Sequence, residues 1–135
     1  MTMWKLLTCS RSVKALAVLA ALWAAAPAGA AQCTANQING RWAFFADDAE
    51  GDWTVCFLSV RQSRNLSGIC DFQSFGESET ISVRGILTVN RACTLAGEFF
   101  GGGRLVGTLQ SDRQGGAGIL EGNFGGIHFS LIRRP

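Results

Sequence analysis

The residue types that enzymes use are scarce in this chain and lack catalytic spacing. His128 is the single histidine, and no acid or nucleophile stands beside it in a recognisable motif. No Gly-x-Ser-x-Gly sequence is present, so the usual hydrolase elbow is missing. The three glycines 101–103 are followed by no lysine or helix start, which favours a hairpin turn over a phosphate loop. We therefore predict no catalytic residue and no cofactor, with an enzyme of unrecognised type as a minor alternative.

An acidic turn is the one other cluster of reactive groups. Residues 47–52 contain four carboxylates in six positions. Oxygen-rich loops of this kind can hold Ca²⁺, although the spacing does not match an EF-hand. A solvated loop is the default interpretation, and a calcium site is the alternative.

Four cysteines follow the N-terminal region, at Cys33, Cys56, Cys70 and Cys93. An even number at long spacings, with one histidine in the whole chain, favours two disulfides over a zinc site. Of the three possible pairings we predict Cys56–Cys70 and Cys33–Cys93. If the strands on either side of Ser63 pair as a hairpin, Cys56 stands directly opposite Cys70, close enough for a bridge.

The N-terminus has the features of an export signal over residues 1–30. Lys5, Arg11 and Lys14 precede an apolar run of 12 residues, 15–26, and a small-residue cleavage motif, Ala28-Gly29-Ala30, follows Pro27. The run is too short to cross about 30 Å of hydrocarbon, so a membrane anchor is the weaker interpretation and we expect no membrane span. Residues 31–135 would then form one exported domain, periplasmic or extracellular.

The charge of that domain argues against nucleic acid as a partner. The chain has 12 basic and 10 acidic residues. Three of the bases and none of the acids lie in the first thirty residues, which leaves nine arginines against ten acids, a net charge near −1. Binding that depends on overall positive charge is therefore excluded.

The rest of the sequence predicts short antiparallel strands joined by turns. Apolar and polar residues alternate, glycine is frequent, and no stretch has helical spacing. The expected strands are Arg41–Ala46, Trp53–Val60, Leu66–Phe72, Ile81–Val89, Thr94–Phe99, Arg104–Gln110, Ile119–Phe124 and Ile127–Ile132.

A glycine repeat within these strands predicts how they curve. Five segments have an apolar residue two positions before and after a glycine, at Gly68, Gly85, Gly97, Gly107 and Gly122. Residues two apart share a face of a strand, so each glycine should lie on the inner face, where the sheet bends sharply or a bulky side chain fills the space. We predict an all-β fold, a small antiparallel eight-stranded up-and-down barrel. A two-sheet sandwich or a solenoid is the alternative.

Aromatic residues supply the candidates for binding. In the expected strand Trp53–Val60 both faces are apolar, so a second cover is needed from the N-terminal lead, a partner subunit or a target protein. The candidate ligand or partner contacts are Trp42, Phe44, Trp53, Phe57, Phe99 and Phe124.

Gly40-Arg41-Trp42, at the start of the first expected strand, resembles the Gly-x-Trp opening of calycin-type barrels. These include the lipocalins, the avidins and the small periplasmic inhibitors of secreted metalloproteases. The inhibitors also carry a tryptophan and then a cysteine in their early strands, as Trp42 and Cys56 do here. They insert an N-terminal arm into the protease cleft, whereas Cys33 would tie down the corresponding segment, 31–39. The avidin biotin-contacting set has no counterpart in this sequence.

Together these features predict an exported, non-catalytic binding protein for a small apolar ligand or a protein partner. An inhibitor of a secreted protease or other hydrolase is the alternative. An oligomer is possible.

Overall fold

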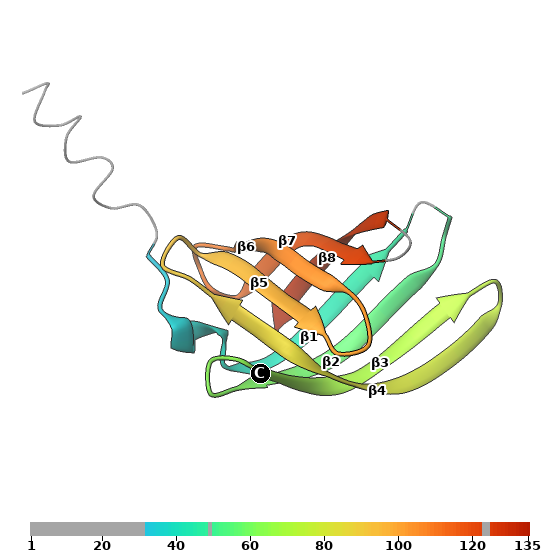
Figure 1. Ribbon diagram of the computed structural model, residues 1–135, viewed down its shortest axis with the longest axis horizontal. Coiled ribbons are helices and arrows are strands. Elements are labelled where there is room, and N and C mark those ends of the chain that lie inside the picture. Colours follow the sequence, from blue (N-terminus) through green and yellow to red (C-terminus); the bar gives the residue numbers. More distant parts are fainter. Residues whose placement is uncertain (1–31, 49, 123–124) are drawn as a thin grey trace, which may run out of the picture. The chain divides into compact units, whose positions relative to one another are not determined.

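The computed structural model describes residues 32–48, 50–122 and 125–135. The predicted signal peptide and Phe124 lie outside these described residues. The described chain forms a closed antiparallel barrel in which each strand pairs with its neighbours in sequence and β1 also pairs with β8 (Figure 1). The predicted eight-stranded up-and-down barrel is confirmed. Its strands are β1 (Gly40–Asp47), β2 (Trp53–Arg61), β3 (Asn65–Ser74), β4 (Glu77–Val89), β5 (Thr94–Phe99), β6 (Arg104–Leu109), β7 (Gly115–Gly122) and β8 (Gly125–Arg133).

Two strand boundaries differ clearly from the prediction. Between the expected strands Leu66–Phe72 and Ile81–Val89 there is only a two-residue turn, Phe75-Gly76, because β3 runs to Ser74 and β4 begins at Glu77. The first residues of β4 were missed because they are exposed on both faces and show no alternation of apolar and polar side chains. Strand β7 begins at Gly115, four residues before the expected start. The start of β7 was missed because the buried Gly116 has no apolar side chain and so does not contribute to the alternating pattern. The side chain of Leu95 fills the space beside Gly116 instead.

Glycines on the inner face let the sheet curve enough to close. A β-carbon at Gly68, Gly85, Gly97 or Gly107 would lie 2.0–2.3 Å from a main-chain carbonyl oxygen of the neighbouring strand. Backbone, not a bulky side chain, therefore occupies the space, so the glycines mark sharp bends. The fifth predicted position is wrong: among the described residues, nothing lies within 4 Å of a β-carbon at Gly122. In β7 the crowded glycine is Gly118, where the nearest carbonyl oxygen is that of Val106, at 2.1 Å.

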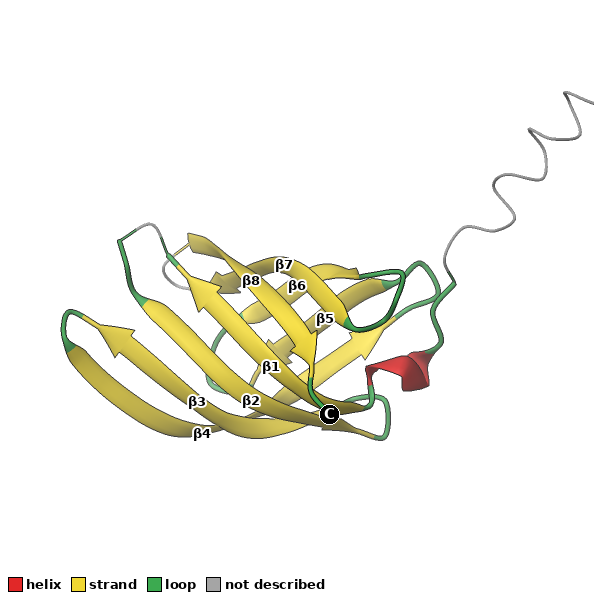
Figure 2. Cartoon of the chain, turned by 180° about the vertical axis from the view of Figure 1, so that it is seen from behind, coloured by secondary structure: helices red, strands yellow, loops and turns green. Residues whose placement is uncertain are grey.

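The inner side chains fill the barrel at one end, which we call the closed end. The short 3₁₀ helix η2 (Ala35–Ile38) packs Ile38 into this end (Figure 2). The indole nitrogen of the buried Trp42 donates a hydrogen bond to the Ile38 carbonyl, at 2.8 Å. The Arg133 guanidinium lies 4.2 Å above the Trp42 ring and donates to the carbonyls of Gln37 and Asn39. The closed end is thus sealed by packing and hydrogen bonds.

Both predicted disulfides are present. Cys33–Cys93 joins the segment before η2 to the start of β5, with a Cα–Cα distance of 5.0 Å. Cys56–Cys70 joins directly opposed residues of β2 and β3, in the register expected from a hairpin around Ser63. Two disulfides are consistent with an oxidising compartment.

Candidate ligand-binding mouth of the barrel

The other end of the barrel, the mouth, contains an apolar cavity. At this end β1, β3, β5 and β7 finish and β2, β4, β6 and β8 begin. The cavity has a volume of about 250 Å³ and takes most of its wall from inner residues of the strands. The lining residues are Phe44, Thr54, Cys56, Cys70, Phe72, Ile81, Val83, Phe99, Phe100, Gly101, Gly102 and Leu120. A wall of aromatic and aliphatic groups with one hydroxyl, from Thr54, suits an apolar ligand with few polar atoms.

A packed aromatic cluster forms the inner limit of the cavity. Phe44 is buried and meets Phe99 edge to face, with ring centroids 5.8 Å apart. Its other neighbour is Phe129, stacked with centroids 5.3 Å apart. Such ring pairs add to the free energy of burial and hold the rings in place. The cavity therefore has a packed floor of aromatic rings.

Beside the cavity, strand β4 extends beyond its partner β5. Strand β4 has 13 residues, but β5 pairs only with Gly85–Val89. Within the described residues, Glu77–Val83 pairs with β3 alone, and the β3–β4 hairpin extends beyond its neighbours (Figures 1 and 2). Ile81 and Val83 line the cavity at this side, and Phe100 in the β5–β6 turn lines it as well. At this side the cavity wall is therefore made of side chains from β4 and from the β5–β6 turn.

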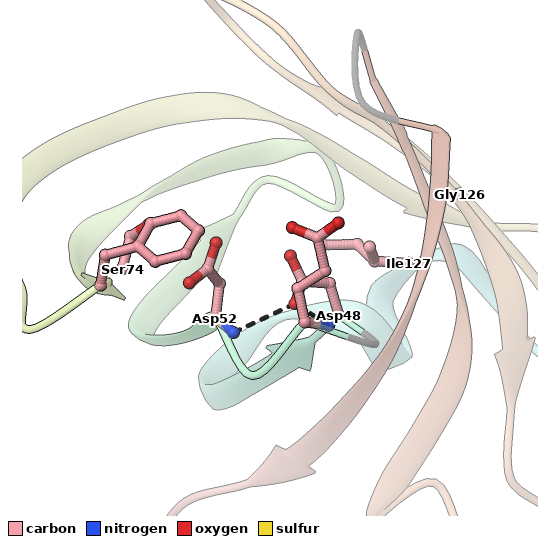
Figure 3. Close-up of a pocket in the computed structure, with 7 residues that line it drawn as sticks. Asp48, Asp52, Ser74, Gly126 and Ile127 are labelled. Carbon is pink, nitrogen blue, oxygen red and sulfur yellow. Dashed lines mark hydrogen bonds between the residues drawn. The ribbon is translucent and has the colours of Figure 1, made fainter.

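An acidic vestibule of about 700 Å³ also opens at the mouth. Its walls are Asp48, Glu50, Asp52, Ser74, Phe75, Gly126 and Ile127 (Figure 3). The Asp48 carboxylate accepts hydrogen bonds from the main-chain N–H of Glu50 and Asp52, at 2.9 and 3.0 Å. This carboxylate therefore holds the loop in shape. No group of three or more His, Cys, Asp or Glu side chains in the described part of the chain is placed to hold a metal ion.

Charge is divided between the two ends of the barrel. Nine of the ten acidic residues lie in the mouth half, and seven of the nine arginines after residue 31 lie at the closed end. The acidic set is Asp47, Asp48, Glu50, Asp52, Asp71, Glu77, Glu79, Glu98 and Glu121, and the basic set is Arg41, Arg61, Arg64, Arg91, Arg113, Arg133 and Arg134. The field at the mouth therefore repels anions and attracts cations.

The structure distributes the predicted contact residues over three places. Phe44 and Phe99 line the mouth cavity, whereas Trp42 is buried at the closed end beneath Arg133. Trp53 and Phe57 lie on the outer surface. Sequence reasoning missed Phe72, Val83 and Leu120 in the cavity wall. Strand alternation predicts that these three side chains point into the barrel. It does not predict at which level along the barrel the side chains leave a cavity.

The outer surface of β8, β1, β2 and β3 carries a group of exposed apolar side chains, here called the outer aromatic face. Its members and their exposed fractions are Phe45 40%, Trp53 43%, Phe57 47%, Ile69 52% and Ile132 53%. The Arg134 guanidinium lies over the Phe57 ring, 4.5 Å from its centroid. Segment 32–39, which the sequence suggested as a cover for β2, lies at the closed end instead, where Arg133 and Cys93 hold it.

Phe75 stands at the tip of the β3–β4 hairpin with 86% of its surface exposed. Its φ is +49° and that of Gly76 is +81°, the pattern of a tight hairpin turn that favours Asn-Gly. A left-handed backbone is unfavourable for phenylalanine and better tolerated by asparagine. We expect Phe75→Asn to raise the free energy of unfolding by about 1 kcal/mol, measured by urea denaturation. Ser74→Asn, one residue earlier in β3, is the control and should change it little. A lower stability of Phe75→Asn would show that the ring packs against the protein.

Comparison with known proteins identifies the fold alone. No family model and no curated protein matches the sequence. Among solved structures the chain resembles a redesigned β-barrel (TM-score 0.52, 19% identity, covering 75% of this chain and 95% of that one). It also resembles a de novo designed fluorescence-activating β-barrel (TM-score 0.51, 19% identity, 75% and 96% covered). These likenesses support a small eight-stranded barrel and do not single out the calycins. No helix within the described residues has the length and hydropathy to cross a bilayer.

Proposed function

We propose that this chain is an exported, non-catalytic binding protein whose mouth cavity takes a small apolar ligand. The observation that supports this most strongly is the cavity of about 250 Å³, walled by phenylalanine, aliphatic and disulfide groups. Ligand sites are typically concave, apolar and largely formed in advance, and this cavity has all three properties. The two disulfides support export because they suit an oxidising compartment.

The charges at the mouth refine the class of ligand. A carboxylate on an apolar tail would meet the field of the acidic residues in the mouth half, which include Asp48, Glu50 and Asp52. An amine on the same tail would be attracted by them. The proposed ligand is therefore neutral or cationic, with an apolar body.

Fluorescence titration with the neutral probe N-phenyl-1-naphthylamine tests this function. We expect saturable binding, and we expect Val83→Trp to weaken it about tenfold or more by filling the cavity, a loss of about 1.4 kcal/mol. Val106→Trp, on the outer surface of β6, is the matched control and should bind normally. Dodecylamine should displace the probe at a lower concentration than dodecanoate in low salt. Binding that is unaffected by Val83→Trp would contradict the proposed site.

Inhibition of a secreted hydrolase is the second candidate, supported by the projecting hairpin. Phe75 is held exposed on an unfavourable backbone, and such strain is often retained where a residue contacts a partner. The outer edge of Glu77–Val83 has backbone groups to which an extended chain can add as a strand. A secreted hydrolase whose activity falls on addition of the protein, and recovers with Phe75→Asn, would favour this function over ligand carriage.

A further inference from the structure

The outer aromatic face is continuous across four neighbouring strands. One row runs from Ile132 through Ala43 and Phe57 to Ile69, each residue paired with the next. In the next row Phe45 pairs with Val55. In the third row Trp53 pairs with Asp47 and is the last aromatic residue of the face. The alternation that buries the inner face of β1 and β2 would normally leave polar residues outside, so this apolar group is a candidate interaction surface.

The size of the face suits the centre of a protein interface. Strands lie about 4.8 Å apart and alternate residues about 6.7 Å apart, so its outermost Cα atoms span about 14 Å by about 13 Å. A stable interface takes about 800 Å² from each partner, with an apolar centre and a polar rim. The outer aromatic face therefore supplies the centre, and the charged residues around it must supply the rim.

The rim has opposite charges at its two ends. Toward the closed end stand Arg41 and Arg134, and the Arg134 guanidinium already touches the face at Phe57. Toward the mouth stands Asp47, paired with Trp53, and Asp71 flanks the middle row of the face beside Val55. A partner surface complementary to this face needs an apolar centre, acids against the arginines and arginines against the acids. A second copy of the same face, turned end for end, has this arrangement.

We propose that the outer aromatic face is the interface of a two-fold symmetric dimer in which the two barrels lie antiparallel. The antiparallel arrangement sets the basic closed end of each barrel beside the acidic mouth of the other. A parallel arrangement would place like charges together along the whole length of the barrels, which is unfavourable. Two-fold pairing of identical surfaces is also the commonest form of homo-oligomer. The mouth cavities stay outside the interface, so the dimer is independent of the proposed ligand function.

Sedimentation velocity of the purified protein, from about 1 to about 100 µM, tests the dimer. We expect twice the mass of the chain at the upper concentrations, and a monomer for Phe57→Lys. Val106→Lys places the same new charge on a residue of β6 with 38% exposure, remote from the face, and should stay dimeric. Unchanged circular dichroism and melting of the two variants shows that both are folded.

A charge exchange tests the antiparallel orientation. Asp47→Arg should weaken the dimer about tenfold or more, because the new arginine meets the arginines of the other copy. Adding Arg41→Asp to the same chain should restore it. In a parallel dimer Asp47 would face Asp47 of the other copy, so Asp47→Arg would replace one like-charge contact by another and change the affinity of the dimer little. A wild-type monomer throughout the concentration range, a dimer that survives Phe57→Lys, or an Asp47→Arg variant that dimerises normally would overturn the proposal.

Discussion

Replacing Gly85 with alanine is expected to be among the most damaging small substitutions in this protein. The new β-carbon would lie 2.0 Å from the Glu98 carbonyl oxygen and 3.1 Å from the Phe99 Cα, so β4 and β5 would have to separate. Overpacking commonly costs 1–3 kcal/mol, and because the atoms here are backbone we expect a loss of about 3 kcal/mol or more. Natural domains of this size are stable by only about 5–15 kcal/mol. Urea denaturation followed by tryptophan fluorescence measures the change.

Gly122→Ala is the matched control for that experiment. Gly122 stands at the same position of the same sequence repeat, yet no described residue comes within 4 Å of its hypothetical β-carbon. Alanine there restricts the unfolded chain, so the free energy of unfolding should rise by up to about 1 kcal/mol. Equal losses for the two variants would show that the crowding at Gly85 does not control closure of the barrel.

Removing the disulfides one at a time should give the second large effect. The Cys33–Cys93 bridge spans a sequence separation of 60 residues and the Cys56–Cys70 bridge one of 14. On the chain-entropy estimate, replacing both cysteines with alanine costs about 4 kcal/mol for the first pair and about 3 kcal/mol for the second. Denaturation of the two double variants without reductant measures both losses.

The two bridges also differ in what they should do to ligand binding. Cys56 and Cys70 line the mouth cavity, whereas Cys33 and Cys93 lie at the closed end. The Cys56→Ala/Cys70→Ala variant should therefore change the affinity for N-phenyl-1-naphthylamine, and the Cys33→Ala/Cys93→Ala variant, while folded, should not. The opposite pattern would place the binding site outside the cavity.

The barrel could be predicted from sequence because its determinants are local. Strand alternation, the glycine positions and the spacing of Cys56 and Cys70 around Ser63 each follow from residues close in the chain. The error at Gly122 shows the limit of this reasoning, because crowding depends on the strand alongside. Gly118 lies outside the glycine repeat, yet a β-carbon there would be crowded by the Val106 carbonyl of the neighbouring strand.

The candidate site was harder to predict than the fold. Alternation assigns Trp42 and Phe44 to the same inner face of β1, but it cannot show that Arg133 and η2 seal one end while the mouth stays partly empty. That difference arises from contacts over more than ninety residues, such as the hydrogen bond from Arg133 to the Asn39 carbonyl. The sequence places Trp53 and Phe57 on one face of an expected strand, but only the barrel shows that this face is the outer one.

Native mass spectrometry of the protein from the compartment in which it accumulates tests the central claim most directly. We expect a chain that begins near residue 31, lighter by four hydrogens for its two disulfides, carrying a neutral or cationic apolar molecule that organic solvent releases. A full-length chain with reduced cysteines and no bound molecule would contradict both the export and the carrier function.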